Sequence, residues 1–324
     1  MSRVLGIGNA LVDVLVQLEH DELLYRFSLP KGSMQLVAED FVENILRHTA
    51  TFTRYQFSGG SAANAIHGLA NLGIETGFLG KVCADEFGDF FHQDLKLNKI
   101  EPKLFKGKAR SGVAMTLITP DTERTFATHL GAAMELCAED LTNELFANYS
   151  YFHIEGYLVQ NHSLIKTAAS LAKQNGLTVS LDLASYNIVE ENLEFLQALV
   201  KEHIDIVFAN EAEAKAFTGQ DEEAALDTLA KLCDIAVVKI GKNGSLIKQG
   251  CQKYKVEIIP ANCVDTTGAG DLYAAGFLYG LICKKPLSEC GRIGSILSGK
   301  VIETIGAKMD KQTWTTIKKM IATR

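Results

Sequence analysis

Short apolar runs alternate with helix-like segments along most of this chain, and that alternation restricts the fold more than any other feature. The helix-like segments are residues 61–72, 161–174, 190–203 and 222–233. The apolar runs are residues 4–7, 77–79, 151–154, 178–181, 204–208 and 235–240. Strands that are buried on both faces of a parallel sheet have this near-continuous apolar character. The alternation therefore predicts an α/β fold whose mostly parallel central sheet is covered by helices on both faces.

Three segments depart from this alternation and predict a second, smaller sheet. Residues 112–119 and 123–128 carry the alternating pattern of strands and flank the turn sequence Pro-Asp-Thr at 120–122. Together they predict a β-hairpin. Residues 11–17 alternate in the same way. An antiparallel sheet attached to an α/β core is a plausible lid over an active site, and a plain extension of the central sheet is the alternative.

The composition favours one domain. The chain has 324 residues, 47% of them hydrophobic, and its five prolines are not gathered into a linker. This is ordinary globular composition with enough apolar material for a large core. We expect a single domain over residues 1–324, with the lid strands inserted at about residues 11–38 and 110–129.

Charge and cysteine content exclude several classes of protein. The formal charge of −7, from 32 Lys and Arg against 39 Asp and Glu, argues against a nucleic-acid partner, which needs a basic face. The longest nearly apolar run, residues 272–283, is shorter than the ~20 residues that span a bilayer. The seven cysteines are scattered without a C-x-x-C pair, which predicts reduced thiols. We expect a cytoplasmic protein with no nucleic-acid partner and no membrane partner.

Two glycine-rich stretches match nucleotide-binding motifs only in part. Gly6 and Gly8 follow the first apolar run, but Leu11 stands where a dinucleotide fingerprint has its third glycine. Residues 294–301 nearly fit a P-loop, but Val301 occupies the position where Ser or Thr would bind magnesium. We therefore predict neither site, and we interpret residues 294–301 as a helix with small packing residues.

The stretch Asp265-Thr266-Thr267-Gly268-Ala269-Gly270-Asp271 carries the strongest chemical signal. The long apolar segment after it predicts a buried helix, whose N-terminus would contain the two glycines. Free backbone N–H groups and the positive end of the helix dipole make such an N-terminus an anion site. This site suits the charge that develops on a transferring phosphoryl group. Asp271 in the first turn is placed to accept a proton from a substrate hydroxyl, and an acid that only complements the helix dipole is the alternative.

Two motifs together make the chain similar to the ribokinase-like, or PfkB, family of carbohydrate kinases, which includes adenosine kinases. Ser58-Gly59-Gly60-Ser61-Ala62-Ala63-Asn64 resembles the N-terminal signature of that family, and residues 265–271 resemble its C-terminal signature. The resemblance implies the ribokinase-like three-layer fold, with Asp271 as the base that deprotonates the acceptor hydroxyl. It implies an anion hole made by Gly268, Ala269 and Gly270. It also implies contacts to sugar hydroxyls from Gly59, Gly60 and Asn64.

The resemblance extends to the ATP side of the expected site. Asn210 and Glu213 resemble the element that positions Mg²⁺ largely through water, although the same pair also fits an ordinary helix start with Asn210 as its cap. Arg124, on the predicted hairpin, would reach phosphate oxygens when the lid closes. ATP and Mg²⁺ are the expected cofactors, and K⁺ is a third if Asp265 and Thr267 line a monovalent-cation site as in some relatives. A turn after a strand resembles the family's nucleotide-side turn and gives three more ATP-binding residues: Lys239, Gly241 and Gly244.

The acceptor side is marked by Gly8-Asn9-Ala10-Leu11-Val12-Asp13, which resembles the start of adenosine kinases. Those enzymes contact the ribose with the Asn and Asp, and they carry proline where this chain has Ala10. Asn9 and Asp13 are therefore the expected acceptor-binding residues, and a carboxylate suits a ribose diol because it accepts from two hydroxyls. Met34 and Phe126 are expected to form apolar walls for a purine, with lid packing as the alternative.

These features predict an ATP-dependent kinase that phosphorylates a primary hydroxyl of a ribose-containing acceptor, with adenosine or another purine nucleoside as the first choice. A sugar kinase acting on ribose, fructose or 2-keto-3-deoxygluconate is the second choice. A sugar- or nucleoside-binding protein without catalysis is a third, from another class. The sequence leaves open whether the protein is a monomer or a homodimer.

Overall fold

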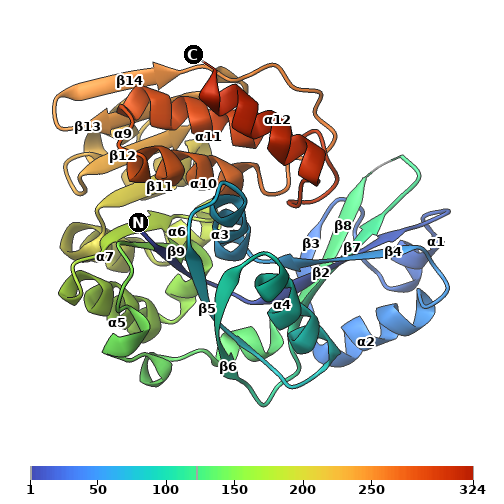
Figure 1. Cartoon of the computed structure of the whole chain (residues 1–324). Helices are drawn as coiled ribbons and strands as arrows, with labels where there is room; N and C mark the ends of the chain where they lie inside the picture. The colour runs from blue at the N-terminus through green and yellow to red at the C-terminus, as the bar shows by residue number, and fades with distance from the viewer. Residues whose placement is uncertain (1, 122, 324) are drawn as a thin grey trace.

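A computed structural model describes residues 2–121 and 123–323 of the protein. It contains a large central sheet and a smaller sheet that projects from the main body (Figure 1). The strands of the large sheet are β1 (Val4–Ile7), β5 (Thr76–Val82), β6 (Ile100–Lys106), β9 (Tyr151–Glu155), β10 (Thr178–Asp182), β11 (Ile206–Asn210), β12 (Ile235–Lys239), β13 (Ser245–Gln249) and β14 (Gln252–Val256). Their order across the sheet is β14-β13-β12-β11-β10-β9-β1-β5-β6.

The large sheet is parallel except at one edge. All pairs from β12 to β6 run parallel, whereas β13 pairs antiparallel with both β12 and β14. The first strand of the chain, β1, lies inside the sheet. Its residue Val4 pairs with Thr76 of β5 on one side and with Tyr151 of β9 on the other. The carboxyl ends of the parallel strands therefore share one edge, where sites form in folds of this kind.

Helices cover both faces of the large sheet. One core cluster receives side chains from α3 (Ser61–Asn71), α4 (Glu86–Leu97), α10 (Ala269–Ile282), α11 (Leu287–Val301) and α12 (Lys311–Ala322). The other receives side chains from α5 (His162–Gln174), α6 (Tyr186–Glu191), α7 (Leu193–His203), α8 (Glu211–Thr218) and α9 (Glu222–Leu229). On β11, Ile206 and Phe208 belong to the first cluster, and Val207 and Ala209 belong to the second. This two-sided burial explains why the central strands are continuous apolar runs.

The smaller sheet lies beside the main body with α1 (Glu22–Arg26) and α2 (Glu39–His48) (Figure 1). Its strands are β2 (Leu11–Gln17), β3 (Met34–Leu36), β4 (Arg54–Gly59), β7 (Gly112–Ile118) and β8 (Arg124–His129). They are ordered β3-β8-β7-β2-β4. The strands β7 and β8 form the predicted antiparallel hairpin. Thr122 of its turn lies outside the described residues.

The chain passes between the two sheets at four points, which group into two pairs. The first pair joins β1 to β2 and β4 to α3. Glu155, the last residue of β9, connects these two passages. Its carboxylate accepts hydrogen bonds from the side-chain amide of Asn9 (2.8 Å), the backbone N–H of Asn9 (3.3 Å) and the backbone N–H of Ala62 (3.1 Å). One buried carboxylate therefore fixes two passages to the central sheet.

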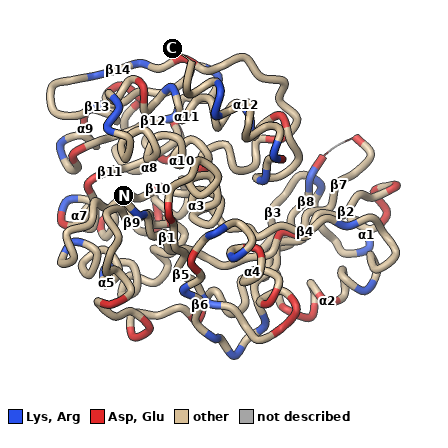
Figure 2. Tube along the Cα trace, in the orientation of Figure 1, with Lys and Arg blue, Asp and Glu red and all other residues tan. Residues whose placement is uncertain are grey.

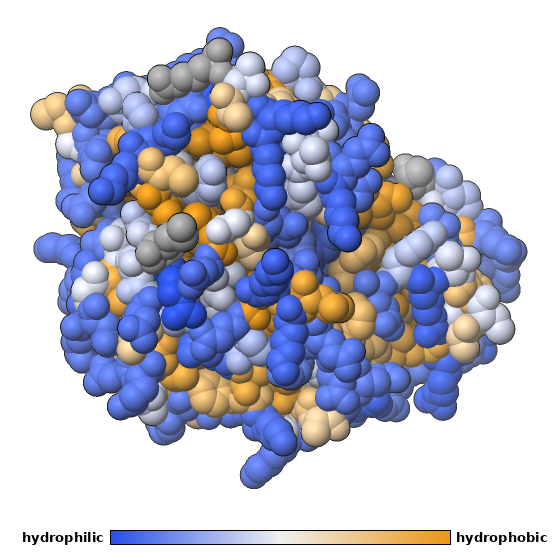
Figure 3. Space-filling model, in the orientation of Figure 1, coloured by the Kyte–Doolittle hydropathy of each residue, from blue (hydrophilic) through white to orange (hydrophobic). Residues whose placement is uncertain are grey.

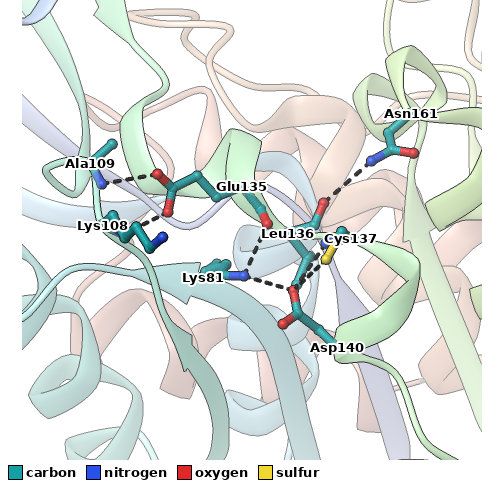
Figure 4. A network of polar contacts seen from close by, with 8 residues as sticks. All are labelled: Lys81, Lys108, Ala109, Glu135, Leu136, Cys137, Asp140 and Asn161. Carbon is teal, nitrogen blue, oxygen red and sulfur yellow. Dashed lines mark hydrogen bonds and ion pairs between the residues drawn. The ribbon is translucent and has the colours of Figure 1, made fainter.

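The second pair joins β6 to β7 and β8 to the 3-10 helix Gly131–Glu135. Figure 4 shows the polar network at this point. Glu135 accepts hydrogen bonds from the backbone N–H groups of Lys108 (2.6 Å) and Ala109 (3.0 Å). Lys81, near the end of β5, donates to the carbonyl oxygen of Glu135 (3.0 Å) and to Asp140 (2.8 Å). Both pairs of passages are thus held by a glutamate at the boundary between the sheets.

The predicted α/β fold class is confirmed, and each of the six apolar runs overlaps a strand of the large sheet. Two local expectations differ from the structure. The expected helix at 190–203 is two helices, α6 and α7, because Asn192 leaves the helical conformation between them (φ −124°, ψ 22°). No predicted segment covered β6, β13 and β14 of the large sheet, or β4 of the small one. The β4 residues Arg54–Gly59 are largely exposed or half-buried, so they lack the apolar run that marks a central strand.

The predicted packing role of residues 294–301 is confirmed, because they lie inside α11. Gly294 and Gly276 let α10 and α11 approach closely. A Cβ on Gly276 would lie 2.8 Å from the Cα of Gly294. Among the described residues, no helix is long and apolar enough to cross a membrane. Charged residues of both signs are interspersed over the trace, so the net charge of −7 is not gathered on one element (Figure 2).

Candidate active site

Two cavities meet where the small sheet joins the main body. The large cavity, of about 880 Å³, lies at the carboxyl ends of three strands and is lined there by Asp182, Asn210 and Lys239. The small cavity, of about 60 Å³, lies under the small sheet. Three residues line both of them: Asp13, Asn64 and Thr267. Figure 3 shows apolar side chains gathered where the small sheet meets the main body, on a face that is otherwise mostly hydrophilic.

Asp271 lines the large cavity from the first turn of α10. Its carboxylate is held from α3, because Ser61 Oγ donates to Oδ1 (2.7 Å) and Asn64 Nδ2 donates to Oδ2 (3.0 Å). Burial raises the pKa of Asp271 to about 6, and the two hydrogen bonds oppose that rise. Near neutral pH the group is therefore an oriented, ionised carboxylate that can take a proton from a hydroxyl.

The start of α10 has the geometry expected of the predicted anion hole. Gly268 is its N-cap residue with φ +76°, which turns the chain into the helix. A Cβ at that position would also lie 2.6 Å from the Cβ of Ala307. Ala269 and Gly270 line the large cavity. The ammonium of Lys239 lies beside this turn, since a Cβ on Gly270 would be 3.0 Å from its Nζ. Helix N-terminus and ammonium together favour phosphate oxygens.

Lys239 is paired within the site. Its Nζ donates to Oδ2 of Asp182 at 2.7 Å, and both residues end parallel strands at the large cavity. Asp182, Glu213 and Asp271 all favour its charged form and hold the pKa of Lys239 above its usual value despite the burial that opposes it. Near neutral pH the site thus keeps a positive charge next to the predicted anion hole.

Asn210 and Glu213 form the helix cap that the sequence offered as an alternative, and they also lie where the Mg²⁺ prediction needs them. They form a capping box at the start of α8, with Asn210 Nδ2 donating to Glu213 (2.6 Å) and the Glu213 N–H donating to Asn210 Oδ1 (2.9 Å). Both also line the large cavity, and burial raises the pKa of Glu213 to about 7. The described residues contain no group of three His, Cys, Asp or Glu that could hold a metal directly. This donor set fits Mg²⁺ held through water and phosphate oxygens.

The nucleotide-side turn predicted after β12 lies at the same cavity, which Gly241 and Gly244 line. Gly244 adopts φ +91°, and a Cβ there would lie 1.9 Å from the carbonyl oxygen of Val256. No other residue fits this position. The close approach packs this turn against the end of β14.

The acceptor residues predicted near the lid are brought together in part. Asp13, Gly60 and Asn64 line the large cavity, and Phe126 lines the small one. Gly59 lines neither cavity. It leaves room for the Asp13 carboxylate, because a Cβ at position 59 would lie 2.4 Å from Oδ2 of Asp13. Burial raises the pKa of Asp13 to about 7, and Lys308 opposes that rise.

Asn9 and Met34 are placed elsewhere. Asn9 is buried and lines neither cavity, because its side-chain amide is bound to Glu155. Met34 is 57% exposed on β3, at the edge of the small sheet, and it also lines neither cavity. In this arrangement Asn9 fixes the β1–β2 passage, and Met34 is not a wall of the cavity.

Arg124 reaches the motif at the start of α10. Its guanidinium forms an ion pair with Asp265 and lies 3.5 Å from Thr267 Oγ1. Asp265 also accepts from the backbone N–H groups of Thr267 (3.0 Å) and Gly306 (2.6 Å). A monovalent cation at Asp265 stays a prediction, and such an ion would share this carboxylate with Arg124.

Sequence reasoning missed three polar residues of the site: Glu155, Asp182 and Lys308. The first two end parallel strands, β9 and β10, and that position could have identified them because strand ends meet at the site edge. Lys308 lies in the loop between α11 and α12 and lines the small cavity. No local pattern marks it, since only the fold brings this loop under the small sheet.

Comparisons with known proteins agree with this geometry. The model of the pfkB family carbohydrate kinases matches residues 34–314. The crystal structure of a probable sugar kinase from Rhizobium etli is 33% identical with a TM-score of 0.87, covering 98% of each chain. The adenosine kinase from Sinorhizobium meliloti is also 33% identical, with a TM-score of 0.86 over 98% of this chain and 99% of that one. A 5-dehydro-2-deoxygluconokinase from Geobacillus kaustophilus is 31% identical over 279 residues, which are 80% of this chain and 82% of the relative.

Proposed function

The chain belongs to the pfkB family of carbohydrate kinases and is therefore a kinase of a sugar or a nucleoside. From that premise we propose that it transfers the γ-phosphoryl group of ATP to a primary hydroxyl of a purine nucleoside. Adenosine is the first candidate for that nucleoside. The observation that carries the proposal is the position of Asp271. It stands in the first turn of α10, between the predicted anion hole and the acceptor residues Asp13 and Asn64. The family uses ATP, generally with Mg²⁺.

In the proposed reaction Asp271 takes the proton of the acceptor hydroxyl. The freed oxygen forms a bond to the γ-phosphorus as the bond to the β–γ bridging oxygen breaks, and ADP leaves. The N–H groups of Ala269 and Gly270 and the ammonium of Lys239 stabilise the charge on the transferring group. Mg²⁺, held through water beside Glu213, supplies further positive charge to the phosphates when it is bound. Closure of the small sheet over the acceptor would exclude water and suppress ATP hydrolysis.

Two observations support a nucleoside as the acceptor. The Sinorhizobium meliloti adenosine kinase resembles this chain over nearly its whole length. Asp13 also lies in the cavity wall, where its carboxylate can accept from both hydroxyls of a ribose.

A sugar acid is the second candidate acceptor. Relatives such as the Geobacillus enzyme are named for a deoxygluconate. The small cavity of this chain also holds two cationic side chains, Lys308 and Arg124, which suit a carboxylate. Arg124 is already paired with Asp265, so Lys308 carries this argument.

An ATP-consumption panel tests the proposal. The acceptors are adenosine, inosine, ribose, fructose, 2-keto-3-deoxygluconate and 5-dehydro-2-deoxygluconate, each with Mg²⁺, and Asp271→Asn is the control for contaminating kinases. We expect turnover of adenosine by the wild type and at least about 10²-fold less by the variant. Turnover of a free sugar or sugar acid, with none on nucleosides, would replace the first candidate by the second. Binding of acceptors without any turnover would support the non-catalytic alternative.

A further inference from the structure

Two polar atoms at the small cavity are buried without a hydrogen-bond partner. Within the part of the chain that the structure describes, these atoms are Nζ of Lys308 and Oδ1 of Asn64, and both residues line the small cavity. The other end of the Asn64 amide is committed, because Nδ2 donates to Asp271. An ammonium has three N–H donors and no acceptor, so leaving it unpartnered inside the protein costs free energy. These two atoms therefore mark positions where ligand oxygens would be stabilised.

Lys308 is surrounded by charged groups from several elements. Asp13 on β2, Asp94 on α4 and Asp271 on α10 favour its charged form, whereas burial lowers the pKa of Lys308 to about 8. Arg124 on β8 lines the same cavity, but its guanidinium is paired with Asp265. Lys308 therefore remains an ammonium near neutral pH and is the cation of this cavity that has no ion pair.

Two of the three carboxylates around Lys308 already have other partners. Asp94 accepts from Ser58 Oγ and from Asn98 Nδ2 (3.2 Å). Asp271 accepts from α3, as described above. Asp13 is the one that lines the small cavity together with Lys308. In its ionised form Asp13 only accepts hydrogen bonds, and it shares one wall of the cavity with the Lys308 ammonium, which only donates.

A hydroxyl is the ligand group that satisfies both kinds of partner, because it donates one hydrogen bond and accepts others. A hydroxyl at this wall would donate to Asp13 and accept from Lys308. A carboxylate would satisfy Lys308 but would face the negative charge of Asp13. A hydrogen in place of the hydroxyl would leave both groups unsatisfied, and sites of that kind discriminate strongly against deoxy analogues.

We propose that Lys308 is an acceptor-binding residue that, with Asp13, selects a vicinal diol in the substrate. The Lys308 ammonium donates a hydrogen bond to one hydroxyl of the diol, and that hydroxyl donates a hydrogen bond to the Asp13 carboxylate. The inference rests on the proposed function, because the diol is the ribose diol of the nucleoside. It adds a residue that determines specificity at the acceptor subsite and that lies outside both sequence motifs.

The test compares Lys308→Met, which keeps the length of the side chain but removes the donor, with Lys308→Arg, which keeps a donor. Binding of adenosine, 2′-deoxyadenosine and 3′-deoxyadenosine is measured by calorimetry, and the KM values for acceptor and ATP are measured separately. We expect Lys308→Met to weaken adenosine binding by about 10- to 100-fold, the range of a hydrogen bond to a charged group. The KM for ATP should stay within about twofold, and Lys308→Arg should recover part of the loss.

Discrimination against the deoxy nucleosides distinguishes ligand binding from a purely structural role. The wild type should prefer adenosine to a deoxy analogue, and Lys308→Met should lose much of that preference. Lys319→Met, an exposed lysine on α12, is the matched control and should change neither value. Equal adenosine affinity and equal discrimination in the wild type and Lys308→Met would overturn the inference while leaving the kinase intact. A wild type that binds and phosphorylates no nucleoside would overturn the proposed acceptor and this inference together.

Discussion

At the scale of single residues, the Asp271 carboxylate is oriented by groups that the local sequence does not contain. The motif at 265–271 predicts an acid at the start of a helix, and the structure places it there. Its donors, Ser61 and Asn64, are more than two hundred positions earlier. Both residues belong to the motif at 58–64, but the resemblance assigned Asn64 to sugar hydroxyls and gave Ser61 no role. The contact itself comes from the packing of α3 on α10.

Replacement of Asp271 by Asn tests its role as the base. The amide keeps the size of the side chain but cannot take the proton, so kcat should fall by at least about 10²-fold. The acceptor Kd should change little, because the predicted acceptor-binding residues Asn64 and Asp13 are unchanged. Turnover and calorimetric binding are measured on the same preparation. Near-normal turnover would remove Asp271 from the role of base.

The pH dependence of the reaction should follow the same residue. A base must be ionised, and burial raises the pKa of Asp271 to about 6. The value of kcat, measured at saturating acceptor so that binding through Asp13 does not enter, should therefore fall about tenfold per pH unit below pH ~6 and level off above it. A profile that stays flat down to pH ~5 would contradict this environment for Asp271. The residual activity of Asp271→Asn should lack the acid limb.

Lys308 and Glu155 show where residue-level prediction stops. Each is a single polar residue with no motif around it in the sequence. What each can do depends on its surroundings: the small cavity for Lys308, and the N–H groups of Asn9 and Ala62 for Glu155. Such a partner is set by the tertiary fold, so one sequence without the fold could not supply it.

At the scale of elements, α3 carries the geometry of the site. It begins directly after β4, and its first turn presents Ser61 and Asn64 to Asp271. Gly60 makes this possible, because it has φ +96° and a Cβ there would lie 2.2 Å from the carbonyl oxygen of Asn9. The close contact joins the two passages that Glu155 also connects.

Gly60→Ala tests this close contact. The positive φ alone costs ~1–3 kcal/mol for a residue with a Cβ, and the clash with Asn9 should add to it. We expect a larger loss in the free energy of unfolding than for Gly73→Ala, where φ is +93° but no atom lies within 4 Å of the added Cβ. The displaced start of α3 should also lower kcat in Gly60→Ala and leave it unchanged in Gly73→Ala. Equal stability losses in the two variants, measured by urea unfolding, would contradict the role of the contact.

Strands buried on both faces could be predicted from the sequence, whereas part-exposed strands near a sheet edge could not. The central strands of the large sheet are apolar runs because helices cover both faces, but β6, β13 and β14 toward its edges are part-exposed and matched no predicted run. The strand β4 lies at the edge of the small sheet, so its residues are mixed and carry little signal. The hairpin of β7 and β8 was predictable because its turn chemistry is local.

At the scale of the whole molecule, buried carboxyls should make stability depend on pH. Burial raises the pKa values of Asp13, Glu155 and Glu213 to about 7. The folded state then binds more protons than the unfolded state up to that pH, so the free energy of unfolding falls as pH rises. Burial lowers the pKa values of His67 and His153, which opposes the trend below their ordinary value of 6.5. The fall should therefore be clearest from pH 6.5 to about 7.

Urea unfolding at about pH 6.5 and about pH 7.5 measures this fall. The ligand-free protein should be less stable at the higher pH. In Glu155→Gln the difference should shrink, because one of the three carboxyls no longer titrates. A stability that rises over this interval would show that the three carboxyls are not buried as acids with raised pKa values.

The position of β1 has a consequence for how the protein is made. This strand leaves the ribosome before its neighbours in the sheet, which begin at Thr76 and Tyr151. The chain must be translated as far as β9 before both edges of β1 are paired. Until then a fully apolar strand remains available to chaperones and to other nascent chains. Glu155, which ends β9, is synthesised at the same moment, so the sheet centre and the anchor of the first two passages become complete together.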